Sequence, residues 1–580
     1  MRVFGSLMMI LFLVVSCSKE ETGKEQELIL SGSIKVTVLL GIEPAIGATV
    51  TTVPETKTKV VTNTGVVIFE EVPVGDYKVN VVLNELEDFI YFQELKVLDN
   101  ETRNIIFEIP EIPVLTEQDL DVELQLNQSY RSLQRIFDAD LYMAYWGDTG
   151  TDILQTNPGA NYSLDELDSY NISPQLNVVN QVWTEHYKQI RQVNRGIDYL
   201  NNPNNVVANN IDRIVSEAEF RFLRGLLYFN LLKIYGNPLL SVTAEVDLNN
   251  PPNYPQNPLT TYAQIEEDLL FAIRNLPVSG SDDRAHQLNA RGLLAKVYMK
   301  MAGFPLNETH NYAKALEQLN IIDGQFELIG DYKSIFNVSN ENSNSEVIFR
   351  IAFDGGQNNS SSFNDFWGPL GVSGSDALVL VPGFADSFRN SSLKFEDPVG
   401  FPIELGDGRF YNSIATFKVE GSAVVNSADP KTWRPLKWYN NEIEDVNFSS
   451  NEFDYPFLRY ADILLMLAEV ENEINGPTPV AYDAINQVRR RAYGNTENDV
   501  ASNLSQTQFF EQVLLERKLE LCFEGHRRDD LIRRGKLQEV IDVYNAANDF
   551  KKDFEPHEYI WPIPQQELDL NPNVVQNPGY

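Results

Sequence analysis

The hydrophobic pattern of the chain changes its period twice, and the first part has a period of two. From residue 31 to residue 110, apolar positions such as Ile34, Val36 and Val38 alternate with polar ones. This alternation predicts half-buried β-strands. Similar short runs, separated by Gly, Pro and Asn, recur at 66–69, 77–83 and 105–109. Strands at this spacing predict a small β-sandwich over residues 31–110.

The pattern becomes helical after a Pro-containing hinge at residues 111–115. Apolar residues from Trp183 to Leu200 recur every three or four positions, which indicates one face of a long helix. Further helices are predicted at 216–235, 290–302, 311–322, 460–474, 482–491 and 509–521, with Gly236 ending the first and Asn289 capping the second. Thr116 and Asp119 have the spacing of a capping box. Helical hairpins in succession predict a mainly α, tetratricopeptide-like array.

The helical signal lapses between about residues 325 and 455, where Gly, Asn, Ser, Pro and aromatic residues dominate. One short strand is predicted at 347–353. A long irregular insertion inside a packed array usually carries function, so this segment is where we expect a binding site.

The composition narrows the possible partners. The 580 residues carry a formal net charge of −37, and 43% of them are hydrophobic. That apolar content is enough for sizeable cores and excludes a disordered acidic chain. Phosphate binding requires clustered Lys and Arg, so the charge argues against nucleic acid as a partner and disfavours polyanionic ligands.

The first residues have the pattern of a bacterial lipoprotein signal. Arg2 precedes an apolar run that ends in Ser16 and Cys17. We expect residues 1–16 to be a cleaved signal peptide and the thiol of Cys17 to be lipidated, with residues 17–30 as a polar tether. The mature protein would then be anchored to a membrane by lipid without spanning it. The alternative is an ordinary secretory peptide with an incidental cysteine.

Motifs for catalysis, cofactors or metal are missing from the sequence. It contains no G-x-S-x-G elbow, HExxH helix, P-loop or G-x-G-x-x-G, and its five histidines lack ligand spacing. A pair of carboxylates that would catalyse glycoside hydrolysis is not ruled out by the sequence, because such residues are recognised by their distance in space and not by their spacing along the chain. Asp148 is the most motif-like acid, and the family resemblance described below implies a structural role for it. Cys522, flanked by apolar residues, is expected to be a buried inert thiol.

Two segments of the predicted sandwich resemble a known domain. Residues 44–50 and 64–77 are similar to the strand start and the "vP-x-G-x-Y" turn of carboxypeptidase-regulatory-like (prealbumin-type) sandwiches. The domain shows no constellation of chemically reactive residues. We therefore expect it to act as a spacer or a docking module.

Several motifs occur in order along the helical part, residues 116–580, at 220–239, 291–298, 458–469, 485–489, 516–535 and 562–580. They include FRFLRGLLYFNL, LRYADILLMLAE and FEGHR. With these motifs, the helical part resembles the SusD/RagB family of outer-membrane nutrient-binding lipoproteins. Charged residues of these motifs lie on helices with dense apolar faces, and we expect them to form buried ion bridges that specify packing: Arg459, Asp462, Glu469, Arg489, Glu516, Arg517, Glu520 and Arg533.

The resemblance implies a cell-surface glycan-binding protein that delivers its ligand to a SusC-like TonB-dependent transporter. It implies binding without catalysis and without a cofactor. The acidic composition favours a neutral glycan, such as a β-glucan. Two alternatives stay open, a peptide-binding RagB-like uptake protein and a tetratricopeptide-like scaffold without a small ligand.

Aromatic side chains in irregular segments are the candidates for stacking on sugar rings, because sugars present apolar C–H faces. The early loop and the insertion supply the candidate glycan-binding residues Tyr162, Tyr170, Asn364, Phe366, Trp367 and Trp433. Each aromatic has an alternative role in packing. Trp183, Trp438 and Trp561 are expected to be core residues.

Overall fold

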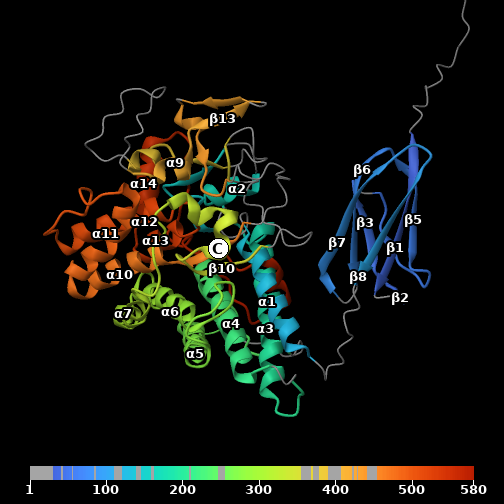
Figure 1. Ribbon diagram of the computed structural model, residues 1–580, viewed down its shortest axis with the longest axis horizontal. Helices are drawn as coiled ribbons and strands as arrows, with labels where there is room; N and C mark the ends of the chain where they lie inside the picture. The colour runs from blue at the N-terminus through green and yellow to red at the C-terminus, as the bar shows by residue number, and fades with distance from the viewer. Residues whose placement is uncertain are drawn as a thin grey trace, which may run out of the picture. The chain divides into compact units, whose positions relative to one another are not determined.

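The computed structural model divides into two compact units, residues 1–114 and 115–580 (Figure 1). The structure describes residues 30–40, 43–54, 56–83, 86–109, 120–138, 146–157, 162–207, 211–245, 255, 257–353, 367–369, 378–388, 407–420, 423–427, 429–439 and 453–580.

The described residues of the first unit form two four-stranded sheets. Its strands are β1 (Ser31–Leu40), β2 (Glu43–Pro44), β3 (Thr49–Val53), β4 (Lys59–Val60), β5 (Val66–Pro73), β6 (Gly75–Leu83), β7 (Leu86–Val97) and β8 (Thr102–Ile109). In one sheet β1 lies between antiparallel β5 and parallel β8, with β2 also pairing with β1; the other sheet has the order β4-β3-β6-β7. The alternating residues Ile34, Val36 and Val38 are fully buried. The period-two pattern therefore predicted both the strands and the face that they bury.

The second unit is mainly helical. Its helices are α1 (Val122–Phe137), α2 (Tyr162–Asp168), α3 (Asn177–Asn201), α4 (Arg213–Tyr235), α5 (Leu259–Asn275), α6 (Gln287–Ala302), α7 (Asn311–Ile322), α9 (Arg409–Ser413), α10 (Tyr460–Asn475), α11 (Pro479–Tyr493), α12 (Gln506–Glu520), α13 (Arg527–Arg533), α14 (Leu537–Ala547) and α15 (Gln565–Leu570). From α3 to α7 each helix packs against the next, and α10 packs against α7, α11 and α12. The predicted array of helical hairpins is confirmed.

Local sequence explains how α3 and α4 pair. Asp212 caps α4 by accepting hydrogen bonds from the backbone N–H groups of Ile214 and Val215. Gly236 ends the helix at a φ of 74°, as predicted. A Cβ on Gly196 of α3 would lie 2.4 Å from the ring of Phe220. Glycine therefore allows the two helices to approach closely.

One predicted helix start is wrong, and a second lies outside the described residues. The N-cap of α6 is His286. Its Nδ1 accepts a hydrogen bond from the backbone N–H of Asn289, and the side-chain oxygen of Asn289 accepts one from the backbone N–H of His286. Asn289 thus completes a capping box from inside the helix. The cap of α1 is Asp121, which accepts from the N–H of Leu124; Thr116 and Asp119 lie outside the described residues.

The insertion contains only short elements in its described part. They are the short helix α9, the 3-10 helices η2 (Tyr332–Phe336), η3 (Val338–Ser343), η4 (Ala385–Phe388) and η5 (Pro430–Thr432), and the strands β10 (Val347–Ile351), β11 (Leu378–Leu380), β12 (Ile414–Ala415), β13 (Phe417–Glu420), β14 (Ala423–Asn426) and β15 (Arg434–Pro435). β11 pairs with β9 (Leu154–Thr156), and β10 pairs with β16 (Tyr455–Arg459), which leads directly into α10. Among the helices of the described residues, none combines the length and the apolar character of a membrane span.

A buried network of ion pairs joins the insertion to the C-terminal helices. We call it the balanced network, because within the described part of the chain five cations meet five carboxylates: Arg409, Lys437, Arg459, Arg489 and Arg491 with Glu346, Asp407, Glu516, Glu520 and Glu524. At its centre the Arg459 guanidinium lies 2.8 Å from Glu346, 2.6 Å from Glu520 and 2.7 Å from Glu524. The predicted ion bridges are confirmed.

Candidate functional site

A hollow of about 180 Å³ lies on the described part of the insertion. We call it the aromatic hollow, and its lining residues are Lys333, Phe336, Asn337, Tyr411, Asn412, Phe417, Leu436, Lys437 and Tyr439. They come from η2, α9, β13 and the segment after β15. Four of the nine are aromatic and two are amides, and both kinds of side chain suit a sugar ligand.

The floor of the hollow is fixed to the helical unit. The ring of Phe336 packs edge-on against Trp438, with ring centroids 5.1 Å apart. The indole N–H of Trp438 donates to the carbonyl oxygen of Phe523 at 2.7 Å. The Lys437 ammonium donates to the Glu524 carboxylate at 2.8 Å and lies 5.0 Å from the Phe336 ring centroid. The aromatic floor is therefore held from below by the segment between α12 and α13.

One buried arginine positions α9, which supplies the rim of the hollow. The guanidinium of Arg409 is fully buried and pairs with Asp407 at 2.7 Å, Glu516 at 2.6 Å and Glu520 at 3.1 Å. Tyr411 and Asn412 follow directly on the same short helix. Because a five-residue helix has little stability of its own, this ion pairing fixes where the Tyr411 ring lies.

The rim presents ring faces and hydroxyl groups. Tyr411 is 37% exposed, and Phe417 and Tyr439 are half-buried. Partial burial raises the pKa of Tyr411 and of Tyr439 above the ordinary value, so both hydroxyls stay protonated and can donate hydrogen bonds at neutral pH. A ring that stacks, next to a hydroxyl that donates, is the combination that a hexose requires.

The described lining of the hollow is not acidic, whereas the protein as a whole has a formal net charge of −37. None of its nine lining residues is acidic. Lys437 is neutralised by Glu524, and Lys333 is exposed. Among the described lining residues, the side chains that face a ligand are therefore uncharged apart from these two lysines.

The structure contradicts three of the sequence-predicted stacking residues, because it buries them. Trp367 is 0% exposed, with its ring centroid 5.8 Å from that of Phe523. Trp433 is 3% exposed, and its indole N–H donates to the carbonyl of Ser427 at 2.9 Å. Tyr170 is 2% exposed, and its hydroxyl donates to the carbonyl of Gly150 at 2.9 Å. These rings offer no free face to a sugar, and they serve packing.

The remaining predicted residues are not placed by the structure. Asn364, Phe366 and Cys17 lie outside the described residues. Tyr162 begins α2, but its side chain is also outside the described part.

The sequence did contain a signal for the hollow. Tyr411, Phe417 and Tyr439 belong to the same aromatic-rich stretch as Trp433. The predictions for this stretch named Trp367 and Trp433, and both of these large rings are buried in the core. Tyrosines, with one polar end, are more often left half-exposed.

The predicted core and structural residues are found in those roles. Trp183, Trp438 and Trp561 are buried, and Cys522 is buried with its pKa raised by loss of solvation to about 11. Asp148 is fully buried and accepts hydrogen bonds from the N–H groups of Gly525 and Arg527 at 2.9 and 3.1 Å. Burial raises its pKa to about 7. These two hydrogen bonds hold residues 146–150 against the segment that begins α13, so the role of Asp148 is structural.

Together, a rigid helical array and a shallow aromatic hollow on its insertion define a binding protein. Comparison with known proteins identifies the family within this class. Residues 345–580 match the model of the SusD family, and residues 110–299 match a model described as starch-binding associating with outer membrane. The chain belongs to the SusD family, whose members bind carbohydrate and are not enzymes.

Individual relatives extend over most of the chain. The SusD-like protein P25 of Formosa agariphila is 29% identical over 487 residues, which are 75% of this chain and 87% of that protein. The starch-binding protein SusD of Bacteroides thetaiotaomicron is 25% identical and covers 72% of this chain and 82% of its own length. A crystal structure of a SusD homologue from B. thetaiotaomicron superposes with a TM-score of 0.68, at 26% identity, and covers 79% of this chain and 96% of its own.

Proposed function

We propose that the protein captures oligosaccharides in the aromatic hollow and passes them to a SusC-like TonB-dependent transporter of the outer membrane. The single observation that carries this proposal is the hollow itself, which combines Tyr411, Phe417 and Tyr439 with two amides above a rigid floor. Ring faces would cover the C–H face of a hexose, while hydroxyl and amide groups take its hydroxyls.

The ligand is a neutral glycan, such as a β-glucan or another plain glucose polymer. Support comes from the net charge of −37, which repels uronate and sulfate chains at long range. It also comes from the relative that is named for binding starch, a neutral glucan. Uncharged groups in the hollow would bind such a chain without the desolvation of an ion.

Affinity electrophoresis against neutral and anionic polysaccharides tests this proposal. We expect the full chain to be retarded in gels that contain a neutral glucan and to migrate normally in gels that contain alginate or a sulfated glycan. Preferential retention by the anionic polymers would overturn the neutral-glycan proposal. Co-purification with oligopeptides, and no retention by any glycan, would favour the RagB-like alternative.

The same proposal places the protein at the cell surface through a lipid on Cys17. Several acyl chains, each contributing about 0.8 kcal/mol per buried CH₂, would hold it in the outer membrane. Residues 17–30 would tether it, and the β-sandwich of residues 31–110 would act as a spacer or docking module between the anchor and the binding unit.

Replacing the lipidated residue gives a direct prediction. Cys17→Ala should move the protein from the membrane fraction to the soluble fraction, because it removes the thiol that carries the lipid. Cys522→Ala is the matched control and should leave the protein in the membranes, since that thiol is buried in the helical core. Retention of the Cys17→Ala protein in membranes after a carbonate or high-salt wash would contradict the lipid anchor.

A further inference from the structure

The loop between α12 and α13, which holds the floor of the aromatic hollow, contains a strained residue. Phe523 in this loop has a φ of 64°, a left-handed conformation that a bulky side chain rarely adopts. Backbone strain of this kind persists only where the surrounding structure fixes the residue, and it is concentrated at functional sites. The strain at Phe523 therefore indicates that this loop does more than connect two helices.

Contacts of the side chain and of the backbone fix Phe523 in this conformation. Its ring packs against Trp367 and Phe384 of the insertion, with centroid distances of 5.8 and 5.6 Å. Its carbonyl oxygen accepts the indole N–H of Trp438 at 2.7 Å. The strained residue thus joins the insertion to the C-terminal helices in two ways.

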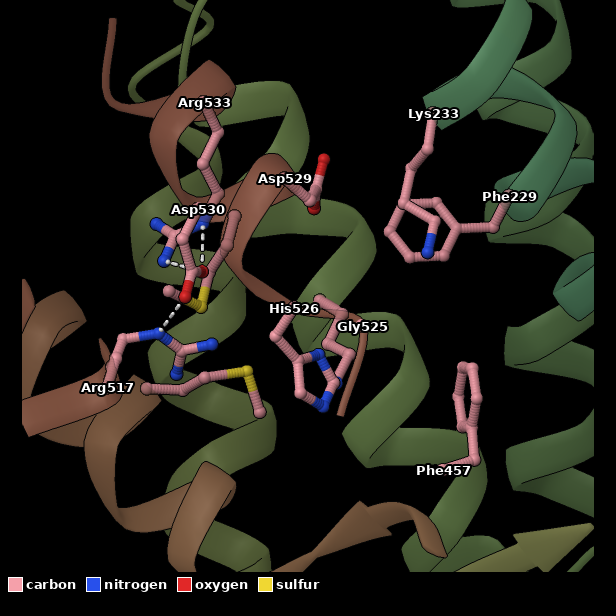
Figure 2. Close-up of a pocket in the computed structure, with 12 residues that line it drawn as sticks. Phe229, Lys233, Phe457, Arg517, Gly525, His526, Asp529, Asp530 and Arg533 are labelled. Atoms are coloured by element: carbon pink, nitrogen blue, oxygen red, sulfur yellow. Dashed lines mark hydrogen bonds and ion pairs between the residues drawn. The ribbon is translucent and has the colours of Figure 1, made fainter. Parts of the chain in front are cut away.

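Part of the same loop borders a cavity. Gly525 and His526 line an internal space of about 30 Å³, with Phe229 of α4 and Phe457 across from them (Figure 2). This volume is room for about two water molecules and is too small for a sugar ring. A loop that borders a cavity lacks packing contacts on that side, so polar contacts have to hold it.

Asp148 supplies such polar contacts. Its carboxylate accepts hydrogen bonds from the backbone N–H groups of Gly525 and Arg527 at 2.9 and 3.1 Å. The two segments also approach closely, because a Cβ on Gly147 would collide with the backbone of Gly525. The carboxylate of Asp148 therefore helps to fix the loop that holds the indole of Trp438.

Trp438 connects this loop to the lining of the hollow. It is 0% exposed and lies in the turn that supplies the lining residues Leu436, Lys437 and Tyr439. The backbone N–H of Tyr439 closes this turn by donating to the carbonyl of Leu436 at 2.8 Å. The Trp438 ring also packs edge-on against Phe336, which is a lining residue as well. One buried indole thus contacts the supports of two rings in the hollow.

We propose that Trp438 is a positioning residue for the ligand, whose hydrogen bond to the carbonyl of the strained Phe523 holds the Phe336 and Tyr439 rings in place to receive a sugar ring. This inference rests on the proposed function, the binding of a neutral glycan in the hollow. Trp438 does not line the hollow, so it acts through its neighbours. Rings that are fixed before the ligand arrives need no ordering on binding, and a hollow that is in place only part of the time binds more weakly in proportion.

Trp438→Phe tests the proposal, because it removes the indole N–H and keeps an aromatic ring in the core. We expect affinity for the glycan to fall about tenfold, since the Phe523 carbonyl loses its donor and the floor loses its fixed position. Isothermal titration calorimetry measures the affinity, with a hexasaccharide of the neutral glucan that the wild type binds in affinity gels. The titrations are made at pH 8, above the raised pKa of Asp148, and at a temperature at which circular dichroism shows each protein folded.

The matched control is Trp561→Phe, which makes the same substitution at another fully buried site. In the part of the chain that the structure describes, Nε1 of Trp561 has no hydrogen-bond partner, and the residue does not line the hollow. Both substitutions should lower the Tm, because both remove buried ring atoms. Trp561→Phe should nevertheless bind the glycan like the wild type, whereas a merely structural role for Trp438 would leave the two variants with the same affinity.

Asp148→Asn is a second test that preserves the volume of the side chain. An amide has one acceptor oxygen in place of two, so one N–H group of the loop loses its partner, and affinity should fall severalfold. Wild-type affinity in either Trp438→Phe or Asp148→Asn would overturn the positioning role, as would an equal loss in Trp438→Phe and Trp561→Phe. A wild type that binds no neutral glycan would instead refute the proposed function, and this inference with it.

Discussion

Tyr411→Ala should abolish most of the glycan binding while leaving the fold intact. Tyr411 is the most exposed ring of the aromatic hollow, and its helix is positioned by the buried ion pairs of Arg409. Central aromatic contacts of binding sites contribute about 2 kcal/mol or more, which corresponds to a loss of about thirtyfold in affinity. Isothermal titration calorimetry with a neutral oligosaccharide measures the loss.

Two further variants separate stacking from other effects. Tyr411→Phe keeps the ring and should retain most of the affinity, since it loses only one hydrogen bond. Phe550→Ala removes an aromatic ring that is 40% exposed and outside the hollow, and it should bind like the wild type. Equal affinities for Tyr411→Ala and Phe550→Ala would show that the hollow is not the binding site.

Arg459→Met should destabilise the helical unit by about 3–5 kcal/mol, because it leaves three buried carboxylates without their shared cation. Arg459 is 1% exposed and contacts Glu346, Glu520 and Glu524, which come from three separate parts of the chain. The loss is measured as a decrease in the free energy of unfolding from urea denaturation.

The matched control replaces an arginine of the neighbouring helix that pairs at the surface. The Arg490 side chain is 41% exposed and lies 2.6 Å from Asp499. Arg490→Met should cost about 1 kcal/mol or less, since solvent screens the pair. If both variants lost the same small amount, the balanced network would not specify the packing of the insertion on α12.

Periodicity predicted the elements well, because a helix or strand repeats its burial locally. The stretch from Trp183 to Leu200 lies in α3, and 311–322 is the range of α7. The cap of α6 was missed, because histidine is an uncommon cap and Asn289 is a common one. Short-range rules find the body of a helix more securely than its first residue.

The binding residues could be located only to a region. The insertion was predicted from its composition, and the hollow lies in it. Which ring is exposed depends on contacts with distant segments: Phe523 covers Trp367, while Glu516 and Glu520 hold the helix that carries Tyr411. A residue's own neighbours in sequence do not contain that information.

A crystal structure of the full chain with a neutral β-glucan oligosaccharide tests the central claim most directly. We expect a sugar ring to stack on Tyr411 or Tyr439, with its hydroxyls within hydrogen-bond distance of Asn412 or a tyrosine hydroxyl. A glycan bound at another surface, with the aromatic hollow empty at saturating ligand, would contradict the account.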